Sequence, residues 1–247
     1  MEQYMKNYLR WLECDKLSDA EKAELAAIRD DDGEIRLRFT SYLSFGTAGL
    51  RGIMKTGMNA MNVHTVAYAT QGLATLIIKE GRAADGVAIA YDSRNNSALF
   101  AKTSAQVLAA AGIKSYLFDD LRPTPELSFA LREYGCVAGI NITASHNPKE
   151  YNGYKAYWED GSQVLQPHDQ GIIDEVNKVT LADVKMTGNE HLIEIIGGEM
   201  DYDYMQAVKT VMIDQETILR QKDLNIVYTP LHGAGRQIIP MCLRSWG

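Results

Sequence analysis

Residues 137–163 carry the densest group of side chains that could do chemistry. An apolar run at residues 137–142 predicts a buried strand, and the polar turn that follows it contains Ser145 and His146. Pro148 disfavours helical geometry at the residue before it, so the chain should turn there instead of continuing as a helix. Ser145 is therefore expected at the carboxyl end of a strand, where α/β proteins place their chemistry.

Polar and cationic residues follow this hydroxyl along the chain. Asn147 comes directly after His146, and the ammonium groups of Lys149 and Lys155 are a few residues further on. A hydroxyl with a possible proton acceptor and several cations nearby suits a group that accepts a phosphoryl and hands it on. An ordinary Ser/Asn/Pro turn with two solvated lysines accounts for the same residues, and for the tetrapeptide SHNP alone it is the preferred interpretation.

A second candidate segment is the glycine-rich stretch LSFGTAGLRG at residues 43–52. Its glycines would let the backbone close upon an anion while the guanidinium of Arg51 reaches that anion. From the residues alone, a flexible turn with an exposed arginine is an equal alternative.

Strand and helix patterns alternate in the part of the chain that leads to Ser145. The expected strands are residues 86–91, 114–118 and 137–142, and the expected helices between them are residues 97–111 and 124–134. Such alternation predicts βαβ units and therefore a mixed, mostly parallel sheet with helices on both faces. Asp92 and Arg94 follow the first of these strands and are interpreted as an ion pair that shapes the cleft from below.

The amino-terminal residues predict two helices, at 2–14 and 18–30, and the second begins with a capping box from Ser18 to Glu21. The acidic run at residues 30–33 is interpreted as a solvated turn in which Gly33 stops the helix.

Further helices are expected at residues 63–80 and 167–179. His64 is interpreted as a helix-start residue and not as a ligand. A hairpin is expected between residues 152–158 and 163–165, and it would carry Lys155 back towards Ser145.

The last part of the chain predicts a helix at residues 202–213, a strand at 224–228 and a helix at 237–246. His232, in the glycine-rich turn before the last helix, could approach the cleft or cap the turn, and the turn is preferred. One strand between two helices cannot cover its own faces. We therefore expect an amino-terminal piece of a longer protein, with a first domain at residues 1–195 and the truncated start of a second at 196–247.

Composition limits the classes of function. The 247 residues are 46% hydrophobic, and 25 basic against 32 acidic residues give a net charge of −7, which argues against nucleic acid or an anionic membrane as the main partner. The three cysteines lie far apart without a CxxC pair, and no apolar run resembles a signal peptide or a membrane span. A cytoplasmic protein with reduced thiols is expected.

The sequence TASHNPKEYNGYK is similar to the phosphoserine loop of the α-D-phosphohexomutase superfamily, the phosphoglucomutase and phosphomannomutase enzymes. Five further segments resemble the same family in the same order: FGTAGLRG, MNAMNVHTV, YDSR, RPTPELSFA and YTPLHGAG. Within the family, the overall pattern most resembles the phosphoglucomutase-2/phosphopentomutase branch.

This resemblance implies a sugar phosphomutase that interconverts hexose or pentose 1-phosphates and 6- or 5-phosphates through a phosphoserine and a bisphosphate. Ser145 would carry the phosphoryl, Arg51 and Lys155 would stabilise its charge and are candidate proton carriers, and His146 would contact it. The resemblance also implies substrate-binding roles for residues of both loops: Thr47, Gly49, Arg51, Ser145, His146, Asn147 and Lys155.

The resemblance further implies Mg²⁺ and an activator of the glucose 1,6-bisphosphate type. In the family the metal bridges the phosphoserine and an aspartate loop of the DGDxDR kind, which residues 1–247 do not contain. Ser145, through its phosphate, is thus the one metal ligand expected in this chain, and the others are expected beyond Gly247. Sugar phosphates and the remaining domains of the longer protein are the expected partners, and the chain alone is expected to be inactive or impaired.

Two other functions stay open at this stage. A non-catalytic module that binds sugar phosphates or takes part in assembly would retain the same loop without turnover. A Ser-His hydrolase is disfavoured because the G-x-S-x-G elbow is missing and a histidine adjacent in sequence is poorly placed to deprotonate the serine. The residues do not indicate which sugar phosphate is preferred.

Overall fold

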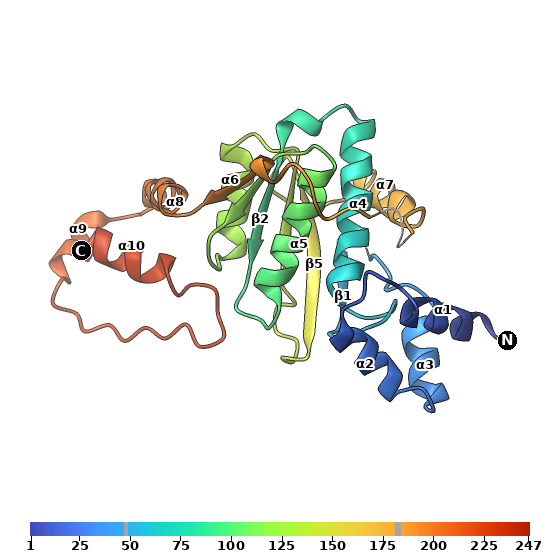
Figure 1. Cartoon of the computed structure of the whole chain (residues 1–247). Coiled ribbons are helices and arrows are strands. Elements are labelled where there is room, and N and C mark those ends of the chain that lie inside the picture. Colours follow the sequence, from blue (N-terminus) through green and yellow to red (C-terminus); the bar gives the residue numbers. More distant parts are fainter. Residues whose placement is uncertain (47–48, 181–183) are drawn as a thin grey trace.

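The computed structural model of the chain describes residues 1–46, 49–180 and 184–247. A six-stranded sheet with the order β1-β5-β4-β2-β3-β6 forms its centre (Figure 1). The strands are β1 (Gly49–Ile53), β2 (Val87–Tyr91), β3 (Ser115–Phe118), β4 (Ala138–Ile142), β5 (Tyr151–Trp158) and β6 (Ile193–Ile196). β2, β3, β4 and β6 are parallel, whereas β5 runs antiparallel to β4 and to β1. The predicted mixed, mostly parallel sheet is confirmed.

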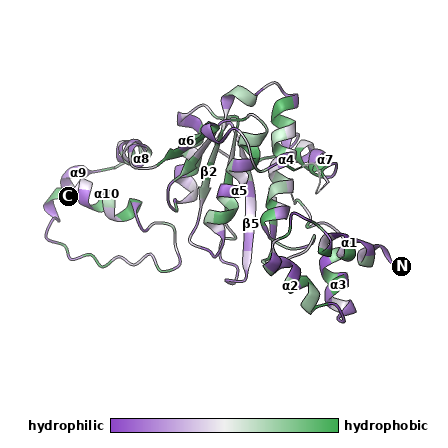
Figure 2. Ribbon diagram, in the orientation of Figure 1, coloured by the Kyte–Doolittle hydropathy of each residue, from purple (hydrophilic) through white to green (hydrophobic). Residues whose placement is uncertain are grey.

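Helices cover both faces of the sheet. The helices of the described residues are α1 (Gln3–Leu12), α2 (Asp19–Ala27), α3 (Asp32–Phe39), α4 (Val63–Lys79), α5 (Ser97–Ala110), α6 (Thr124–Glu133), α7 (His168–Val176), α8 (Gly198–Thr210), α9 (Gln215–Arg220) and α10 (Ile238–Trp246), with 3₁₀ turns at Ala83–Asp85 and Glu190–Leu192. Strand β2 shows why two layers form, because its side chains alternate between the faces. Val87 and Ile89 pack with α4 and α5, whereas Ala88 and Ala90 pack with α6 and α8. Hydrophobic residues gather accordingly in the central strands and in α4 (Figure 2).

The amino-terminal residues form three helices, and the predicted end of the second one is wrong. Asp31 caps a third helix, α3, by accepting a hydrogen bond from the amide of Glu34 at 2.9 Å, and Gly33 lies inside that helix. The acidic residues therefore stand at a helix amino terminus, where the helix dipole favours negative charge. The capping box from Ser18 to Glu21 is confirmed.

An aromatic cluster joins these three helices to the rest of the fold. The ring of Phe39 meets Tyr8 and Trp11 edge to face, at centroid distances of 5.6 and 5.8 Å. Tyr68 of α4 and Val107 of α5 belong to the same buried cluster. The amino-terminal helices thus pack on the two helices that cover the sheet.

The predicted hairpin between residues 152–158 and 163–165 is wrong in its partner. Only an isolated bridge pairs Tyr157 with Gln163, whereas residues 154–158 of β5 pair with β4 and residues 151–155 pair with β1. The antiparallel turn is therefore the stretch between β4 and β5, residues 143–150, which we call the serine loop. Burial decides the pairing, because β5 is covered on both faces only in the interior of the sheet.

The predicted strand at residues 224–228 is also wrong. This stretch is extended but unpaired in the described part of the chain, and Leu224 and Val227 are 65% and 96% exposed. A strand requires neighbours to satisfy its backbone, and no described strand lies beside this one. The predicted helices on either side are present as α8 and α10, and α8 begins earlier than expected, at Gly198.

The region around the expected domain division is tied to the sheet. β6 pairs with β3 and completes the edge of the sheet, α8 packs on α6, and Asp201 of α8 pairs with the buried Arg122 just before α6. The division into residues 1–195 and 196–247 stays a prediction. Across the described ranges, every helix is too short or too polar to traverse a lipid bilayer.

Candidate active site

The strand register brings the predicted site residues to one end of the sheet. Because β4 and β5 form an antiparallel pair, Lys155 lies opposite Asn141, near the point where β4 enters the serine loop. On the other side of β5, Arg51 of β1 lies opposite Gly153. Arg51, Lys155 and the serine loop are thus placed by a single run of three hydrogen-bonded strands.

Ser145 occupies a strained and exposed position in this loop. Its φ angle is 53°, in the left-handed region that residues other than glycine seldom adopt. Its amide donates to Oγ1 of Thr143 at 3.2 Å, and its Oγ lies 3.3 Å from Nδ1 of His146. Strain of this kind persists where the surroundings enforce it, and it clusters at functional sites.

Arg94 supplies that enforcement. Its guanidinium donates to four backbone carbonyls of the loop region: Ser145 at 2.6 Å, Asn147 at 2.7 Å, Pro148 at 3.0 Å and Tyr151 at 3.1 Å. Nε of Arg94 lies 3.4 Å from Oδ2 of Asp92, so the predicted ion pair below the cleft is confirmed. Parallel pairing of β2 with β4 places Asp92 directly beside the end of β4, where its amide donates to the carbonyl of Ile142 at 3.1 Å.

Ser145 lines two pockets. The small pocket, of about 430 Å³, is bounded by Ser44, Gly46, Gly49, Leu50, Arg51, Thr143, Ala144, Ser145, Tyr154 and Lys155. The structure thus brings together Ser145, Arg51 and Lys155 as expected, and Nη1 of Arg51 also donates to Oδ1 of Asn147 at 3.4 Å. Thr47, for which the resemblance also implies a substrate-binding role, lies outside the described residues.

The large pocket, of about 730 Å³, opens on the other side of Ser145. It is bounded by Ser93, Arg94, Asn95, Ser145, His146, Asn147, Lys149 and His232. Sequence reasoning missed Ser93 and Asn95, although their position after a parallel strand was the available signal. It also preferred a turn role for His232, and the structure places this residue both in a turn and at the pocket.

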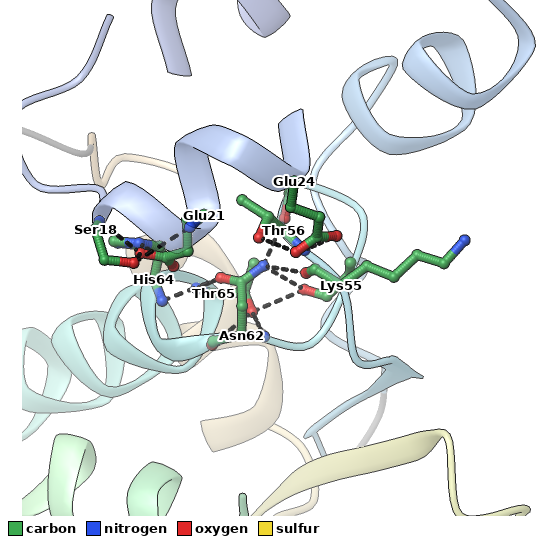
Figure 3. A network of polar contacts seen from close by, with 10 residues as sticks. Ser18, Glu21, Glu24, Lys55, Thr56, Asn62, His64 and Thr65 are labelled. Carbon is green, nitrogen blue, oxygen red and sulfur yellow. Dashed lines mark hydrogen bonds and ion pairs between the residues drawn. The ribbon is translucent and has the colours of Figure 1, made fainter. Parts of the chain in front are cut away.

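A polar network holds the stretch that follows β1 (Figure 3). The carboxylate of Glu24 accepts hydrogen bonds from the amide and the hydroxyl of Thr56, at 3.1 and 2.6 Å. Burial alone would raise the pKa of Glu24, but the bonds from Thr56 and then Arg38 outweigh it and lower the pKa. Lys55 pairs with Glu34 at 2.6 Å. Helices α2 and α3 thereby fix the chain that leaves Arg51.

The same network accounts for His64 at the start of α4. Its amide donates to Oδ1 of Asn62 at 3.0 Å, and its buried ring lies 3.0 Å from Glu21. Burial opposes ionisation of Glu21, yet hydrogen bonds from His64 and Ser18 lower its pKa to about 2. The prediction that His64 is a helix-start residue is confirmed.

Gly49 shows how closely β1 must approach β5. A Cβ atom at this position would stand 1.8 Å from the carbonyl oxygen of Tyr154, and the φ angle of 147° also excludes most side chains. We expect Gly49→Ala to destabilise the domain by about 3 kcal/mol or more, because the strands must separate. The control Gly198→Ala meets no atom within 4 Å and should change stability little. Urea unfolding of both variants measures this, and equal midpoints would contradict the close approach.

Over residues 1–46, 49–180 and 184–247, no group of three His, Cys, Asp or Glu side chains is placed to hold a metal ion. Mg²⁺ takes oxygen ligands in a near-octahedral arrangement, which Ser145 alone cannot supply. The expectation that Ser145 contributes a single ligand through its phosphate stays a prediction.

Known proteins with the same sequence pattern and fold identify the family. Residues 42–183 match the model of phosphoglucomutase/phosphomannomutase, alpha/beta/alpha domain I. The chain is 32% identical over 251 residues to a phosphopentomutase of Homo sapiens, covering 96% of this chain and 41% of that protein. It is 38% identical over 211 residues to a phosphoglucomutase of Staphylococcus haemolyticus, covering 83% and 38%.

A solved structure agrees with these relatives. The protein of Thermus thermophilus that is assigned as a phosphomannomutase superposes with a TM-score of 0.70 at 25% identity, covering 83% of this chain and 43% of that one. The chain spans about two fifths of the length of the curated relatives it matches. Because the family model matches more than half of the chain, the chain belongs to the phosphoglucomutase/phosphomannomutase family.

Proposed function

We propose that the chain carries the phosphoryl-bearing serine of a sugar phosphomutase, an isomerase of hexose or pentose monophosphates. The observation that supports this most is the position of Ser145. Its exposed hydroxyl lies on a strained turn between a pocket that contains Arg51 and Lys155 and a larger pocket open to a ligand. Relatives named phosphopentomutase and phosphoglucomutase support the same activity.

Each transfer exchanges a proton for a phosphoryl group between two oxygens. Phosphorylated Ser145 gives its phosphoryl to a sugar hydroxyl: the bond from Oγ to phosphorus breaks, a bond from the sugar oxygen to phosphorus forms, and Oγ ends with a proton. The bisphosphate then reorients and returns its other phosphoryl to Ser145 by the reverse exchange. No further reactant is required, and Arg51 and Lys155 are the candidate proton carriers.

Positioned cations are the main requirement of this chemistry. The transition state spreads negative charge over the oxygens of the transferring phosphoryl, so fixed positive groups stabilise it. Arg51 and Lys155 would supply that charge from the small pocket, and His146, 3.3 Å from Oγ of Ser145, would contact the phosphoryl or the transferring oxygen. Gly49 in the small pocket and Asn147 in the large one would also contact the substrate, and Thr47 keeps the substrate-binding role that the resemblance implies.

The proposal extends to the surroundings of the reaction. Mg²⁺ would neutralise the phosphoserine with ligands from outside the described residues, and a bisphosphate such as glucose 1,6-bisphosphate would prime the serine. A cytoplasmic location fits the three free thiols, Cys14, Cys136 and Cys242. Burial raises the pKa of Cys136 to about 12, so this thiol is inert.

Mass spectrometry of the whole protein after incubation with glucose 1,6-bisphosphate and Mg²⁺ tests the proposal. We expect one phosphoryl group on Ser145 in the wild-type protein and none in Ser145→Ala. Ser162→Ala is the control, because Ser162 is exposed, lines neither pocket and should leave the phosphorylation intact. Circular dichroism should show Ser145→Ala folded, since the hydroxyl is exposed.

A Ser145 that stays unmodified in the whole protein with Mg²⁺ would overturn the carrier role. The second candidate, a module that binds sugar phosphates without turnover, would then be favoured. The observation behind that candidate is the lack of a three-ligand metal group within the described ranges. Retained affinity for glucose 1-phosphate without phosphorylation would be its expected result.

A further inference from the structure

We infer that the imidazole of His232 binds the sugar phosphate with which Ser145 exchanges its phosphoryl group. This inference rests on the proposed function and adds a residue from outside the stretch that matches the family model, residues 42–183. His232 lines the large pocket, whose other residues come from the serine loop and from the turn after β2.

The turn that carries His232 is shaped to present it. His232 has a φ angle of 63°, and the amide of Gly233 closes the turn by donating to the carbonyl of Pro230 at 2.5 Å. A histidine in the left-handed region is uncommon, and backbone strain of this kind clusters at functional sites. The residue is exposed, so a ligand can reach it.

Contacts to the sheet hold this turn at the pocket. The hydroxyl of Ser93, just after β2, donates to the carbonyl of His232 at 3.4 Å. At the base of the turn, the side-chain amide of Gln237 donates to Asp120 at 2.7 Å, and Arg236 pairs with the same carboxylate. Asp120 follows β3, so the turn is attached at the carboxyl ends of two neighbouring strands.

Two side chains of the large pocket, Lys149 and His232, are available to bind a ligand. The guanidinium of Arg94 is occupied by the carbonyls of the serine loop. Within the described residues, neither the ammonium of Lys149 nor the ring of His232 is held by another side chain. An imidazole donates to or accepts from a sugar hydroxyl and, when protonated, pairs with a phosphate oxygen.

The size of the large pocket agrees with this assignment. Pockets that bind small molecules measure about 300 to 1,000 Å³, and this one measures about 730 Å³. Ser145 borders both pockets, so a phosphoryl held by Arg51 on one side faces a sugar held on the other. The turn that carries His232 forms one wall of the large pocket, and the serine loop forms another. His232 would therefore contact the sugar phosphate from the side opposite Ser145.

Nuclear magnetic resonance of the histidine rings tests the inference on the whole chain. The chain has five histidines, and variants of each assign their signals. Addition of glucose 1-phosphate should move the ring signals of His146 and His232 and leave His191, an exposed histidine on the 3₁₀ turn Glu190–Leu192, in place. Movement of His232 with inorganic phosphate alone would assign the contact to the phosphate, and movement only with glucose 1-phosphate would assign it to the sugar.

Two variants keep the fold while they remove the imidazole. Asparagine and glycine both accept the left-handed conformation, so His232→Asn and His232→Gly should fold. We expect either to weaken glucose 1-phosphate binding about tenfold, and His191→Asn to leave it unchanged.

The two failures are distinguishable. If His146 moves and His232 does not, the inference is wrong while the proposed site at Ser145 stands. If neither ring moves, the large pocket does not take the sugar phosphate, and the proposed function fails together with the inference.

Discussion

Replacing Arg94 with alanine should release the serine loop and slow phosphorylation of Ser145 by glucose 1,6-bisphosphate about a hundredfold or more. The reason is geometric, because one guanidinium binds four carbonyls between Ser145 and Tyr151 and keeps Ser145 at its positive φ angle. A displacement of about 1 Å in a reacting group can cost a hundredfold in rate. Arg94→Lys should restore little of the phosphorylation rate, since an ammonium cannot reproduce the planar array of donors of a guanidinium.

Two measurements separate this effect from general unfolding. The rate of phosphoserine formation reports on the site, and amide hydrogen exchange of residues 143–150 reports on the loop whether or not transfer occurs. Arg132→Ala is the control, because Arg132 is exposed and donates to one carbonyl, that of Ser128. If the amides of residues 143–150 exchange as slowly in Arg94→Ala as in the wild type, Arg94 does not hold the serine loop in place.

The second large effect is expected at Glu126, a buried carboxyl on α6. Arg122 binds Asp201 through two hydrogen bonds of 2.6 and 2.9 Å, and Glu126 lies 3.8 Å from the same guanidinium. Burial first, and then the neighbouring Asp201 carboxylate, raise the pKa of Glu126 to about 9. Burial opposes ionisation of Asp201, but hydrogen bonding to Arg122 outweighs it and lowers the pKa of Asp201.

The sign of the pH dependence follows from these directions. The folded chain keeps the Glu126 proton up to about pH 9, whereas the unfolded chain releases it near the ordinary value of 4.5. Stability from this group is therefore complete below about pH 4.5 and is lost as the pH rises towards 9. Asp201 acts oppositely, because its contribution is present above its ordinary value of 3.8 and is lost as the pH falls through its lowered pKa.

Glu126→Gln should remove the loss of stability at alkaline pH, since the amide of glutamine does not ionise in this range. Relative to wild type, we expect the variant to gain on the order of 3 kcal/mol in the free energy of unfolding between pH 5 and pH 9. Urea unfolding at pH 5, 7 and 9 measures this, with Glu133→Gln, an exposed carboxyl at the end of α6, as the control. Parallel pH profiles for wild type and Glu126→Gln would show that Glu126 is ionised in the folded chain.

Much of the fold could be predicted because the relevant signals are local. Apolar runs bounded by turns identify β2, β3 and β4, and the alternation with helices implies their parallel pairing. Strand β1 escaped prediction, because five residues with two glycines carry no strand signal and gain their structure from β5. Gly33 was misplaced for a related reason: the same acidic residues can end one helix or begin the next, and packing of Phe39 decides between them.

The candidate site divides in the same way. The serine loop and Arg51 could be found from residue types and from the resemblance that they carry. The role of Arg94 as a four-carbonyl clamp depends on the register of β2 with β4, and the approach of His232 depends on the attachment of a distant turn at Asp120. Contacts between segments far apart in sequence leave no periodicity to detect.

The edge position of β1 makes the three site groups unequal. Lys155 lies on β5, which has a strand on each side, and Ser145 lies in the loop between β4 and β5. Arg51 lies on β1, which pairs with β5 alone. An edge strand has backbone hydrogen bonds to one neighbour only, so we expect β1 to open at a lower cost in free energy than β4 or β5. On warming, the guanidinium of Arg51 is therefore expected to leave the small pocket before Lys155 does.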